Sequence, residues 1–437
     1  MIRILTHLTL AASLTLAVPA TAAPYCADLN VQDQLPKKYQ KRGPFYSDVS
    51  TGWIIGKDQL KNKYAVTSEA IALWKEIKAE FDNRGANLIV MAAPPRPLFA
   101  PGAAIDAMDL PEDLNLSEIK KGFSDYITAL NAAGIVAPDL SVIAQGPAAE
   151  GYYFTRDTHW TPQGAALSAA HLNASIGNAS VQDSMARITN TATYEEKGSL
   201  AGVVKDACGN RPKIEVVSAP QYAQQGSASS LLGDAPIKDE IALIGTSFSD
   251  RYQRDAYQVA DALAFMMDAS VDNFSVTGGG MVGSMETFIR SGALKEGNYQ
   301  TVVWETPYSA PLTHVDGLRQ ILGALQTTSE SIEIGTLDTH VGDDWVSYEQ
   351  IFSIEDIQTL EIETKQTNTG QLVVEFIHAD GKKTRTKMGK TDRIAADLRS
   401  NKWAFSLKNM STSQIVRIKL RLPKASRQET AVIHFFK

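Results

Sequence analysis

The chain has 437 residues, of which 44% are hydrophobic and 21% are charged, so it can form a large core and divide into two domains. Its formal net charge of −7 excludes the broad basic surface by which proteins bind nucleic acid, and no nucleic-acid partner is expected. An anionic ligand would need a local cluster of basic side chains.

The first 22 residues have the pattern of a secretory signal peptide. Arg3 supplies the positive charge, Leu8–Val18 is apolar but too short to span a bilayer, and Ala20-Thr21-Ala22 has the small residues of a cleavage site. Cleavage there predicts a soluble mature chain in the periplasm with no membrane-inserted segment. A lipoprotein anchor at Cys26 and an uncleaved anchor helix are the less favoured alternatives.

Both cysteines, Cys26 and Cys208, lie in the predicted mature chain. An oxidising compartment favours a disulfide between them, and closing so long a loop stabilises a protein by about 5 kcal/mol in the chain-entropy model. Two buried thiols are the alternative. Neither cysteine has a neighbour at metal-ligand spacing, and no nucleotide-binding fingerprint is present, so neither a metal nor a cofactor is expected.

Residues 23–310 alternate between apolar strands and amphipathic helices. Strands are predicted at Asn87–Ala92, Glu240–Ile244, Val271–Val276 and Thr301–Trp304. Helices are predicted at Ser68–Asn83, Leu116–Ala133, Pro162–Ile176 and Ser249–Met267. This alternation is typical of an α/β fold with a parallel sheet covered on both faces, in which ligands bind at the carboxyl ends of the strands.

The pattern changes at about Asp343 to short alternating or β-branched runs separated by turn residues. The runs are Leu360–Glu363, Gln371–Ile377, Lys402–Leu407 and Ile415–Leu422. They predict a small all-β sandwich over residues 343–437. Residues 311–342 are predicted to connect the two parts and to contain one helix near Asp316–Leu325.

Gly245-Thr246-Ser247-Phe248 follows a predicted strand and precedes a helix predicted from about Ser249. A serine on a strand-to-helix turn presents its hydroxyl beside free backbone N–H groups, which can stabilise an oxyanion. The alternative is that one of these hydroxyls only caps the helix, and the turn taken alone favours that alternative.

Asp157-Thr158-His159 lies in a loop, expected to be exposed, just before a helix with Thr161 as N-cap and Pro162 as first residue. Residues two apart in an extended loop point to the same side, so the carboxylate of Asp157 can hold the imidazole of His159. The second imidazole nitrogen is then free to take the proton of Ser247. Each residue alone is more often structural, but the combination favours a Ser–His–Asp triad.

Two further segments end strands at the same expected edge of the sheet. In Thr277-Gly278-Gly279-Gly280 the backbone can approach a ligand closely, and the N–H of Gly279 is a candidate oxyanion donor; a flexible turn is the alternative. Arg96, within Pro94–Pro97, is a candidate substrate contact, with an ordinary solvated arginine as the alternative.

The predicted sandwich contains a basic cluster, with eight basic and two acidic residues between positions 381 and 402. This density suits the carboxylates of a uronate polymer. The candidate carbohydrate-binding residues are Lys387, Lys390, Arg393, Arg399 and Trp403, and Trp345 could also stack on a sugar ring. The alternative is a solvated hairpin face above core tryptophans.

Arg156-Asp157-Thr158-His159-Trp160-Thr161-Pro162, taken with Gly245-Thr246-Ser247-Phe248, resembles the periplasmic polysaccharide O-acetyltransferases of the AlgX/AlgJ type. The order of signal peptide, permuted SGNH-hydrolase-like domain and β-sandwich carbohydrate-binding module is similar to the AlgX layout. The resemblance implies that Ser247 carries the acetyl group, that His159 is the base and that Asp157 orients it. It also implies the Cys26–Cys208 bond within the catalytic domain.

The predicted function is therefore O-acetylation of an exported polysaccharide, alginate or a similar uronate polymer, through an acetyl-serine intermediate. The resemblance also implies membrane-bound partners that pass acetyl groups across the membrane and export the polymer. An SGNH carbohydrate esterase is one alternative, because water can take the place of the sugar hydroxyl. A non-catalytic polysaccharide-binding scaffold of an export complex is the other.

Overall fold

The computed structural model describes residues 23–222, 240–251, 254–294, 299–328, 333–340, 345–348, 357–367, 369–408, 410, 415–423 and 430–437. The predicted signal peptide, residues 1–22, lies outside the described residues. Over the described ranges, no helix combines the length and the apolar character needed to cross a bilayer.

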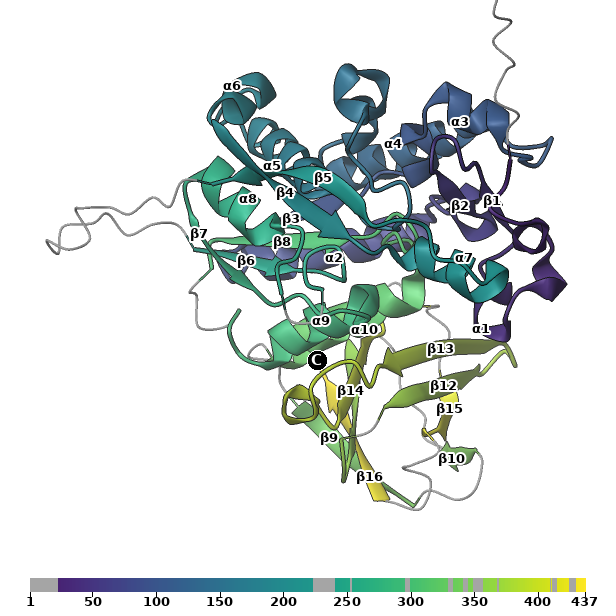
Figure 1. Ribbon diagram of the computed structural model, residues 1–437. Helices are drawn as coiled ribbons and strands as arrows, with labels where there is room; N and C mark the ends of the chain where they lie inside the picture. Colours follow the sequence, from purple (N-terminus) through teal and green to yellow (C-terminus); the bar gives the residue numbers. More distant parts are fainter. Residues whose placement is uncertain are drawn as a thin grey trace, which may run out of the picture.

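A four-stranded parallel sheet forms the centre of the first domain (Figure 1). In spatial order its strands are β3 (Asn87–Ala92), β8 (Thr301–Thr306), β6 (Glu240–Ile244) and β7 (Ser270–Asn273). All four strands were predicted, but β8 continues beyond Trp304 and β7 ends before Val276. Both extra residues of β8 are buried, and one of them belongs to the active site described below.

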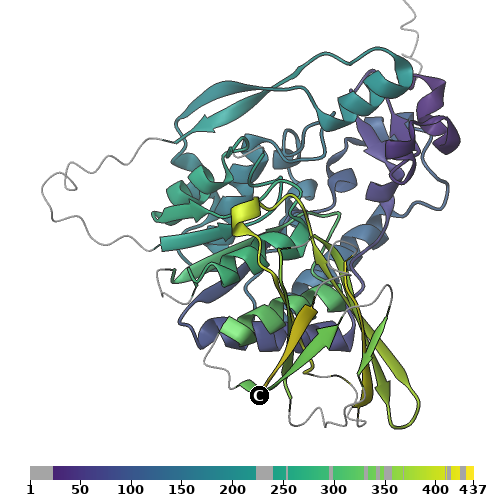
Figure 2. The same ribbon diagram turned by 90° about the horizontal axis from the view of Figure 1, so that it is seen from below.

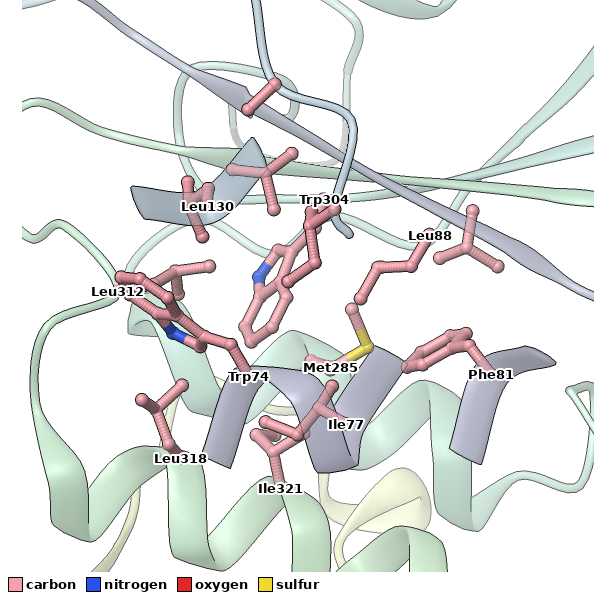
Figure 3. Packing of buried hydrophobic residues seen from close by; sticks show 14 of the residues in the cluster. Trp74, Ile77, Phe81, Leu88, Leu130, Met285, Trp304, Leu312, Leu318 and Ile321 are labelled. Atoms are coloured by element: carbon pink, nitrogen blue, oxygen red, sulfur yellow. The ribbon is translucent and has the colours of Figure 1, made fainter. Parts of the chain in front are cut away.

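Helices cover both faces of this sheet, because successive strand side chains point to opposite faces. One face packs against α2 (Ser68–Asp82), α4 (Leu116–Ala132), α9 (Gly280–Arg290) and α10 (Val315–Thr328). The other face packs against α5 (Pro162–Ser175) and α8 (Val259–Met267). Figure 3 shows the first core, where Trp304 of β8 lies among Trp74 and Ile77 of α2, Met285 of α9 and Ile321 of α10. The predicted α/β fold is confirmed.

Shorter elements surround this centre. The remaining helices are α1 (Lys37–Gln40), α3 (Gly102–Ala107), α6 (Val181–Ala186) and α7 (Ser199–Cys208). Two antiparallel pairs are β1 (Phe45–Ser47) with β2 (Ile54–Gly56), and β4 (Asn190–Glu196) with β5 (Glu215–Gln221). Short 3-10 helices are Ala27–Asn30, Gln32–Gln34, Lys57–Leu60, Arg96–Phe99, Leu140–Gln145, Pro147–Ala149 and Ala396–Leu398. In Figure 2, β4 and β5 form a teal ribbon along the edge of the domain.

The C-terminal part is a sandwich of two antiparallel four-stranded sheets, as predicted. One sheet has the order β10 (Val346–Tyr348), β15 (Ile415–Arg421), β12 (Gly370–His378) and β13 (Lys383–Lys390). The other has the order β14 (Lys402–Ser406), β11 (Thr359–Thr364), β16 (Thr430–Phe436) and β9 (Glu333–His340). Because β9 pairs with β16, the sandwich includes residues that precede the predicted start at Asp343.

Helix α10 joins the two domains, as Figure 1 shows, and lies against the sandwich. Gly323 permits this close approach, because a Cβ at that position would lie 2.4 Å from the Cα of Phe405 in β14. Arg319 of the same helix donates to the carbonyl oxygens of Ser406 at 2.7 Å and Lys408 at 2.8 Å. The sandwich is therefore held against the catalytic domain by backbone contact as well as by hydrogen bonds.

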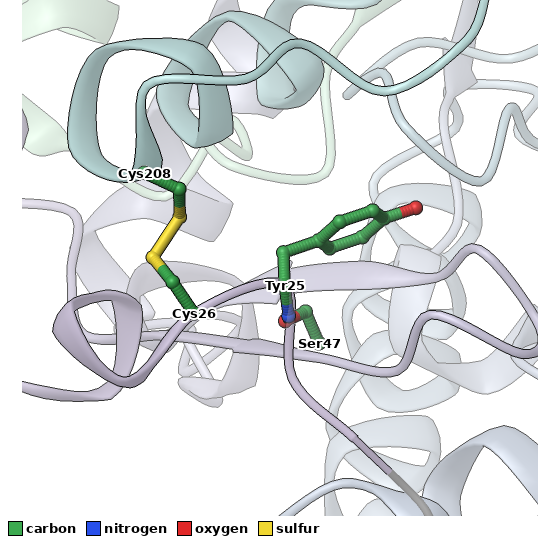
Figure 4. The surroundings of a disulfide bond; sticks show 4 residues. All are labelled: Tyr25, Cys26, Ser47 and Cys208. Atoms are coloured by element: carbon green, nitrogen blue, oxygen red, sulfur yellow. A yellow bond between two sulfur atoms is a disulfide. The ribbon is translucent and has the colours of Figure 1, made fainter.

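The predicted disulfide between Cys26 and Cys208 is confirmed, with the two Cα atoms 5.8 Å apart (Figure 4). It connects the N-terminal segment to the end of α7, 182 positions later in the sequence. Leu29 and Leu35 of the N-terminal segment pack against Leu200 and Val203 of α7 beside it. The bond thus fixes α7, whose first residue contacts the active site.

Candidate active site

Ser247 lies on a tight turn at the carboxyl end of β6 and is half-buried. The carbonyl oxygen of Thr246 accepts the N–H groups of Ser249 at 3.1 Å and Asp250 at 2.9 Å, which closes the turn. The predicted helix from Ser249 is wrong: α8 begins at Val259, where the carboxylate of Asp255 accepts the N–H of Val259 at 2.7 Å. Ser247 is therefore presented by a turn rather than by a helix N-terminus.

Asp157 and His159 lie in the loop before α5, which begins at Pro162 as predicted, with Thr161 accepting the N–H of Gly164 at 3.0 Å. The loop itself was expected to be exposed, and this expectation is wrong. Asp157 is fully buried and His159 is only 7% exposed.

The start of α7 and the start of β5 cover this loop. The carbonyl oxygen of Arg156 accepts the N–H groups of Leu200 and Ala201. The carboxylate of Glu215 in β5 accepts the N–H groups of Thr155 at 2.8 Å and Arg156 at 3.1 Å. Both segments follow the loop by 40 residues or more in sequence, so a reading of the loop alone could not reveal its cover.

The structure brings the three predicted triad residues into one hydrogen-bonded row. His159 Nε2 lies 2.8 Å from Ser247 Oγ, across 88 positions of sequence. His159 Nδ1 contacts Asp157 Oδ1, and the same oxygen accepts the backbone N–H of His159 at 2.9 Å. This geometry can move a proton from the serine hydroxyl to the imidazole while the carboxylate holds the ring.

The carboxylate of Asp157 has further donors on its second oxygen. The N–H of Ser199, the first residue of α7, lies 2.5 Å from Oδ2, and Arg251 Nη1 lies 3.5 Å from it. Burial alone would raise the pKa of Asp157, but the imidazole, Arg251 and the Ser199 N–H outweigh burial and hold the pKa well below its usual range. Asp157 is therefore a carboxylate at any ordinary working pH.

Arg251, Tyr257 and Glu196 complete the surroundings of the histidine and were not predicted. The ring of Tyr257 stacks on that of His159, with centroids 5.1 Å apart and planes at 29°. Arg251 contacts the Tyr257 hydroxyl and pairs with Glu196 of β4 at 3.0 Å. In the sequence, only the short distance of Arg251 and Tyr257 from Ser247 could have suggested that they belong to the site. No sequence feature pointed to Glu196.

Glu305, at the carboxyl end of β8, was also missed because the predicted strand ended at Trp304. It is fully buried under the turn that carries Ser247, and its Oε2 accepts the N–H of Thr246 at 2.7 Å. Its oxygens also lie 3.1 Å from the hydroxyls of Thr246 and Ser249. Burial raises the pKa of Glu305 to about 7, despite these hydrogen bonds.

The two other catalytic-domain candidates have structural contacts. The N–H of Gly279 donates to the carbonyl of Val276 at 2.9 Å, so in this structure it closes a turn. By contrast, within the described part of the chain the N–H of Ser247 has no acceptor, and it is the better oxyanion donor. Arg96 is fully buried and donates to the carbonyls of Ile54, Phe154 and Thr155, so the predicted substrate contact at Arg96 is wrong.

The basic cluster of the sandwich divides into buried and exposed members. Trp403 is fully buried in the sandwich core, so the prediction that it stacks on sugars is wrong. Lys390 Nζ lies over the Trp403 ring and donates to the carbonyls of Ser400 and Lys402, and burial lowers its pKa to about 8. Arg399 donates to the carbonyls of Ile394 and Asp392 in its own loop.

Lys387 and Arg393 are the exposed residues among the five binding candidates, and each lines a groove between the domains. Lys387 lines a groove of about 880 Å³ together with the glycine turn 278–280. Arg393 lines a second groove of about 770 Å³, together with Asp250 of the nucleophile loop. Thr277, which precedes the glycine turn, lines the second groove and donates to Asp250, so the groove of Arg393 borders the loop that carries Ser247. Trp345, the other aromatic candidate, lies beneath the guanidinium groups of Arg385 and Arg421.

A family model described as "SGNH hydrolase-like domain, acetyltransferase AlgX" matches residues 50–308. Among curated relatives, the alginate biosynthesis protein AlgX of Pseudomonas syringae pv. tomato is 23% identical over 412 residues, which cover 89% of this chain and 82% of that protein. The probable alginate O-acetylase AlgJ of Pseudomonas putida is 27% identical over 273 residues, covering 58% of this chain and 67% of that protein.

A solved structure with the same fold over both domains is that of Pseudomonas aeruginosa AlgX, with a TM-score of 0.70 at 19% sequence identity. The superposition covers 94% of this chain and 99% of that one. The family match covers the segments that carry Asp157, His159, Ser247 and Glu305. Because it spans more than half of the sequence, the chain belongs to the AlgX family of SGNH hydrolase-like acetyltransferases.

Proposed function

We propose that this protein transfers acetyl groups to hydroxyls of an exported uronate polysaccharide, with Ser247, His159 and Asp157 as its catalytic triad. The 2.8 Å contact between His159 Nε2 and Ser247 Oγ is the observation that carries the proposal. Membership of an acetyltransferase family supports the reaction class. The names of two relatives, alginate biosynthesis protein and probable alginate O-acetylase, support alginate or a similar polymer as the acceptor.

In the first half of the reaction, Ser247 Oγ attacks the carbonyl carbon of an acetyl donor as its proton passes to His159 Nε2. The negative charge that develops on the carbonyl oxygen is stabilised by the backbone N–H of Ser247. Asp157, held as a carboxylate, stabilises the imidazolium and keeps Nδ1 protonated. The imidazolium then gives its proton to the leaving group, and Ser247 carries the acetyl ester.

In the second half, a sugar hydroxyl attacks the acetyl-serine and its proton passes to His159 Nε2. Collapse of the tetrahedral intermediate returns that proton to Ser247 Oγ and releases the acetylated sugar. Water in place of the sugar would release acetate, which is the esterase reaction. Selection between the two therefore depends on whether a sugar hydroxyl or water reaches the acetyl-serine.

The exposed Lys387 and Arg393 are the residues proposed to contact carboxylates of the polymer, because each lines a groove between the domains and the groove of Arg393 includes Asp250 of the nucleophile loop. Lys390, Arg399 and Trp403 support the loop and the strand that present them. A periplasmic location is proposed from the signal-peptide pattern and agrees with the Cys26–Cys208 disulfide. The proposed partners are membrane-bound proteins that deliver acetyl groups and export the polymer.

The test uses the purified protein with a chromogenic acetyl ester and oligouronate acceptors, and follows acetylated sugar by mass spectrometry and free acetate separately. We expect acetylated sugar with the native protein and none with Ser247→Ala, because triad losses cost about 10⁴–10⁶ in rate. The control is Ser168→Ala, which removes another buried serine hydroxyl, on α5, that is bonded to Tyr152 and to the carbonyl of Gly164. Near-native transfer by folded Ser247→Ala would overturn the triad. Acetate without acetylated sugar would favour the esterase.

A further inference from the structure

A buried acid lies directly beneath the turn that carries the nucleophile, and the mechanism above gives it no proton to move. Glu305 is fully buried at the end of β8, the strand that neighbours β6 in the sheet. Within the described ranges its hydrogen bonds come from uncharged donors, namely the N–H and hydroxyl of Thr246 and the hydroxyl of Ser249. Among the described residues no cation pairs with it.

The donors of Glu305 flank Ser247 on both sides. Thr246 precedes the nucleophile and is bonded through two of its groups, and Ser249 is the fourth and last residue of the same turn. One carboxylate therefore fixes the turn before and after Ser247, at 2.7–3.1 Å. The N–H of Thr246 is thereby turned into the protein, whereas that of Ser247 has no acceptor among the residues that the structure describes.

The space around Gly245 agrees with this arrangement. A Cβ at Gly245 would lie 2.4 Å from Glu305 Oε2 and 3.0 Å from the buried hydroxyl of Ser275. The end of β6 thus passes so close to the carboxylate that only glycine fits between them. The packing of β6, β8 and the turn therefore depends on the position of the Glu305 carboxylate.

We propose that Glu305 is a positioning residue for acetyl transfer: its carboxylate holds the Thr246–Ser249 turn so that Ser247 Oγ meets His159 and the Ser247 N–H faces the oxyanion. This inference rests on the proposed role of Ser247 as nucleophile. A purely structural acid would be expected to matter for stability alone. Ionisation of Glu305 is unfavourable, because burial disfavours the charged carboxylate and raises its pKa to about 7.

The test compares kcat and KM for a chromogenic acetyl ester in Glu305→Met and Glu305→Gln. Methionine has a similar length but accepts none of the three bonds, so we expect kcat to fall about 10²-fold with KM nearly unchanged, since a displacement of about 1 Å at a reacting group has that effect. Glutamine keeps one oxygen for the Thr246 N–H, so we expect rescue to within about tenfold of native kcat.

The matched control is Glu361→Gln, which alters another buried glutamate, paired with Arg290 and Lys402 at the domain interface. Its kcat should equal that of the native protein. If Glu305→Met does not fold, the test uses Thr246→Val instead. Its effect on kcat is measured in the native protein and in Glu305→Gln. The two changes act on one hydrogen-bonded unit, so their combined loss of kcat should be smaller than the product of the single losses.

Native-like kcat in folded Glu305→Met, an equal loss in Glu361→Gln, or fully multiplicative losses in the double variant would each overturn the positioning role. Ser247→Ala is measured in parallel. If Ser247→Ala remains active, the assignment of Ser247 as the nucleophile is wrong. If Ser247→Ala is inactive while Glu305→Met has native-like kcat, only the role proposed for Glu305 is wrong.

Discussion

The two sites predicted for this protein, the triad of the α/β domain and the basic cluster of the sandwich, differ in what the fold does with their members. The triad residues come from two loops 88 positions apart and converge within hydrogen-bonding distance. The candidate residues of the sandwich are neighbours in sequence, yet the fold separates them. Trp403 is in the core, Lys390 is mostly buried and donates to backbone carbonyls, and Arg399 binds its own loop, whereas Lys387 and Arg393 are exposed where they line the grooves.

The difference follows from what each kind of chemistry requires. Proton transfer needs atoms at fixed short distances, so a motif pair that carries an acid, an imidazole and a hydroxyl has only a few useful arrangements. Binding a charged polymer needs only exposed cations at loose spacing. A local excess of lysine and arginine on a strand therefore includes side chains with quite different tasks, because alternate residues of a strand point to opposite faces.

The largest expected effect is at Trp403, which was predicted to bind sugars but lies in the sandwich core. If this residue belongs to the core, Trp403→Ala should lower the free energy of unfolding of the sandwich by about 3–5 kcal/mol, because it leaves a large cavity. Trp403→Phe should cost less and leave KM for oligouronates unchanged. The measurements are denaturant unfolding under non-reducing conditions and acceptor kinetics. A Phe variant that folds normally but loses affinity for the acceptor would restore Trp403 as a sugar contact.

On the catalytic side, the pH dependence of stability should distinguish an unpaired buried acid from a paired one. The pKa of Glu305 is about 7 in the folded protein against 4.5 for an ordinary glutamate. Between these values the folded state keeps a proton that the unfolded state has lost, so stability falls as the pH rises. Relative to Glu305→Gln, the native protein should lose about 3 kcal/mol of unfolding free energy from pH 4.5 to pH 7 and beyond.

Glu361 gives the matched comparison, because pairing with Arg290 and Lys402 outweighs burial and lowers its pKa. Its contribution is present above the ordinary pKa of a glutamate and is lost as the pH falls through the lowered value. The difference between native protein and Glu361→Gln should therefore grow with pH, opposite in sign to that for Glu305→Gln. Urea unfolding at several pH values measures both; parallel curves for native protein and Glu305→Gln would contradict the raised pKa.

The sequence was sufficient where local signals determine structure. The apolar run Asn87–Ala92 is β3, and Thr161 and Pro162 mark the start of α5. It was insufficient where the local signal is obscured or a distant segment decides. The carboxylate of Asp255 delays α8 to Val259, a signal hidden by the apolar residues around it. Strand β9 gains its place by pairing with β16, almost a hundred residues later.

The same distinction applies to the site. Asp157, His159 and Ser247 could be named because each stands in a short motif with a local reason for being presented. Glu305, Arg251 and Glu196 matter through contacts made across 55 residues or more, which no local pattern encodes. Arg96 shows the converse error: its place after a strand suggested a ligand, but three backbone carbonyls bind its guanidinium group in the interior.

The smallest expected effect tests the exposed half of the basic cluster. Lys387→Gln combined with Arg393→Gln removes one exposed cation of the sandwich from each of the two grooves. Because exposed charge pairs are worth about 1 kcal/mol or less each, KM for an oligouronate should rise only about tenfold, with kcat for a small uncharged acetyl ester unchanged. The effect should shrink as salt is added, since salt screens exposed charges.

Lys382→Gln combined with Lys383→Gln is the matched control, because both lysines are exposed on the same hairpin and line neither groove. This pair removes the same charge from the same sheet and should leave KM for the oligouronate nearly native. An equal rise of KM in both double variants would mean that the polymer responds to the net charge of the sandwich rather than to the grooves. In that case the position of Lys387 and Arg393 in the grooves would have no bearing on the acceptor, and the basic cluster would act as one diffuse surface.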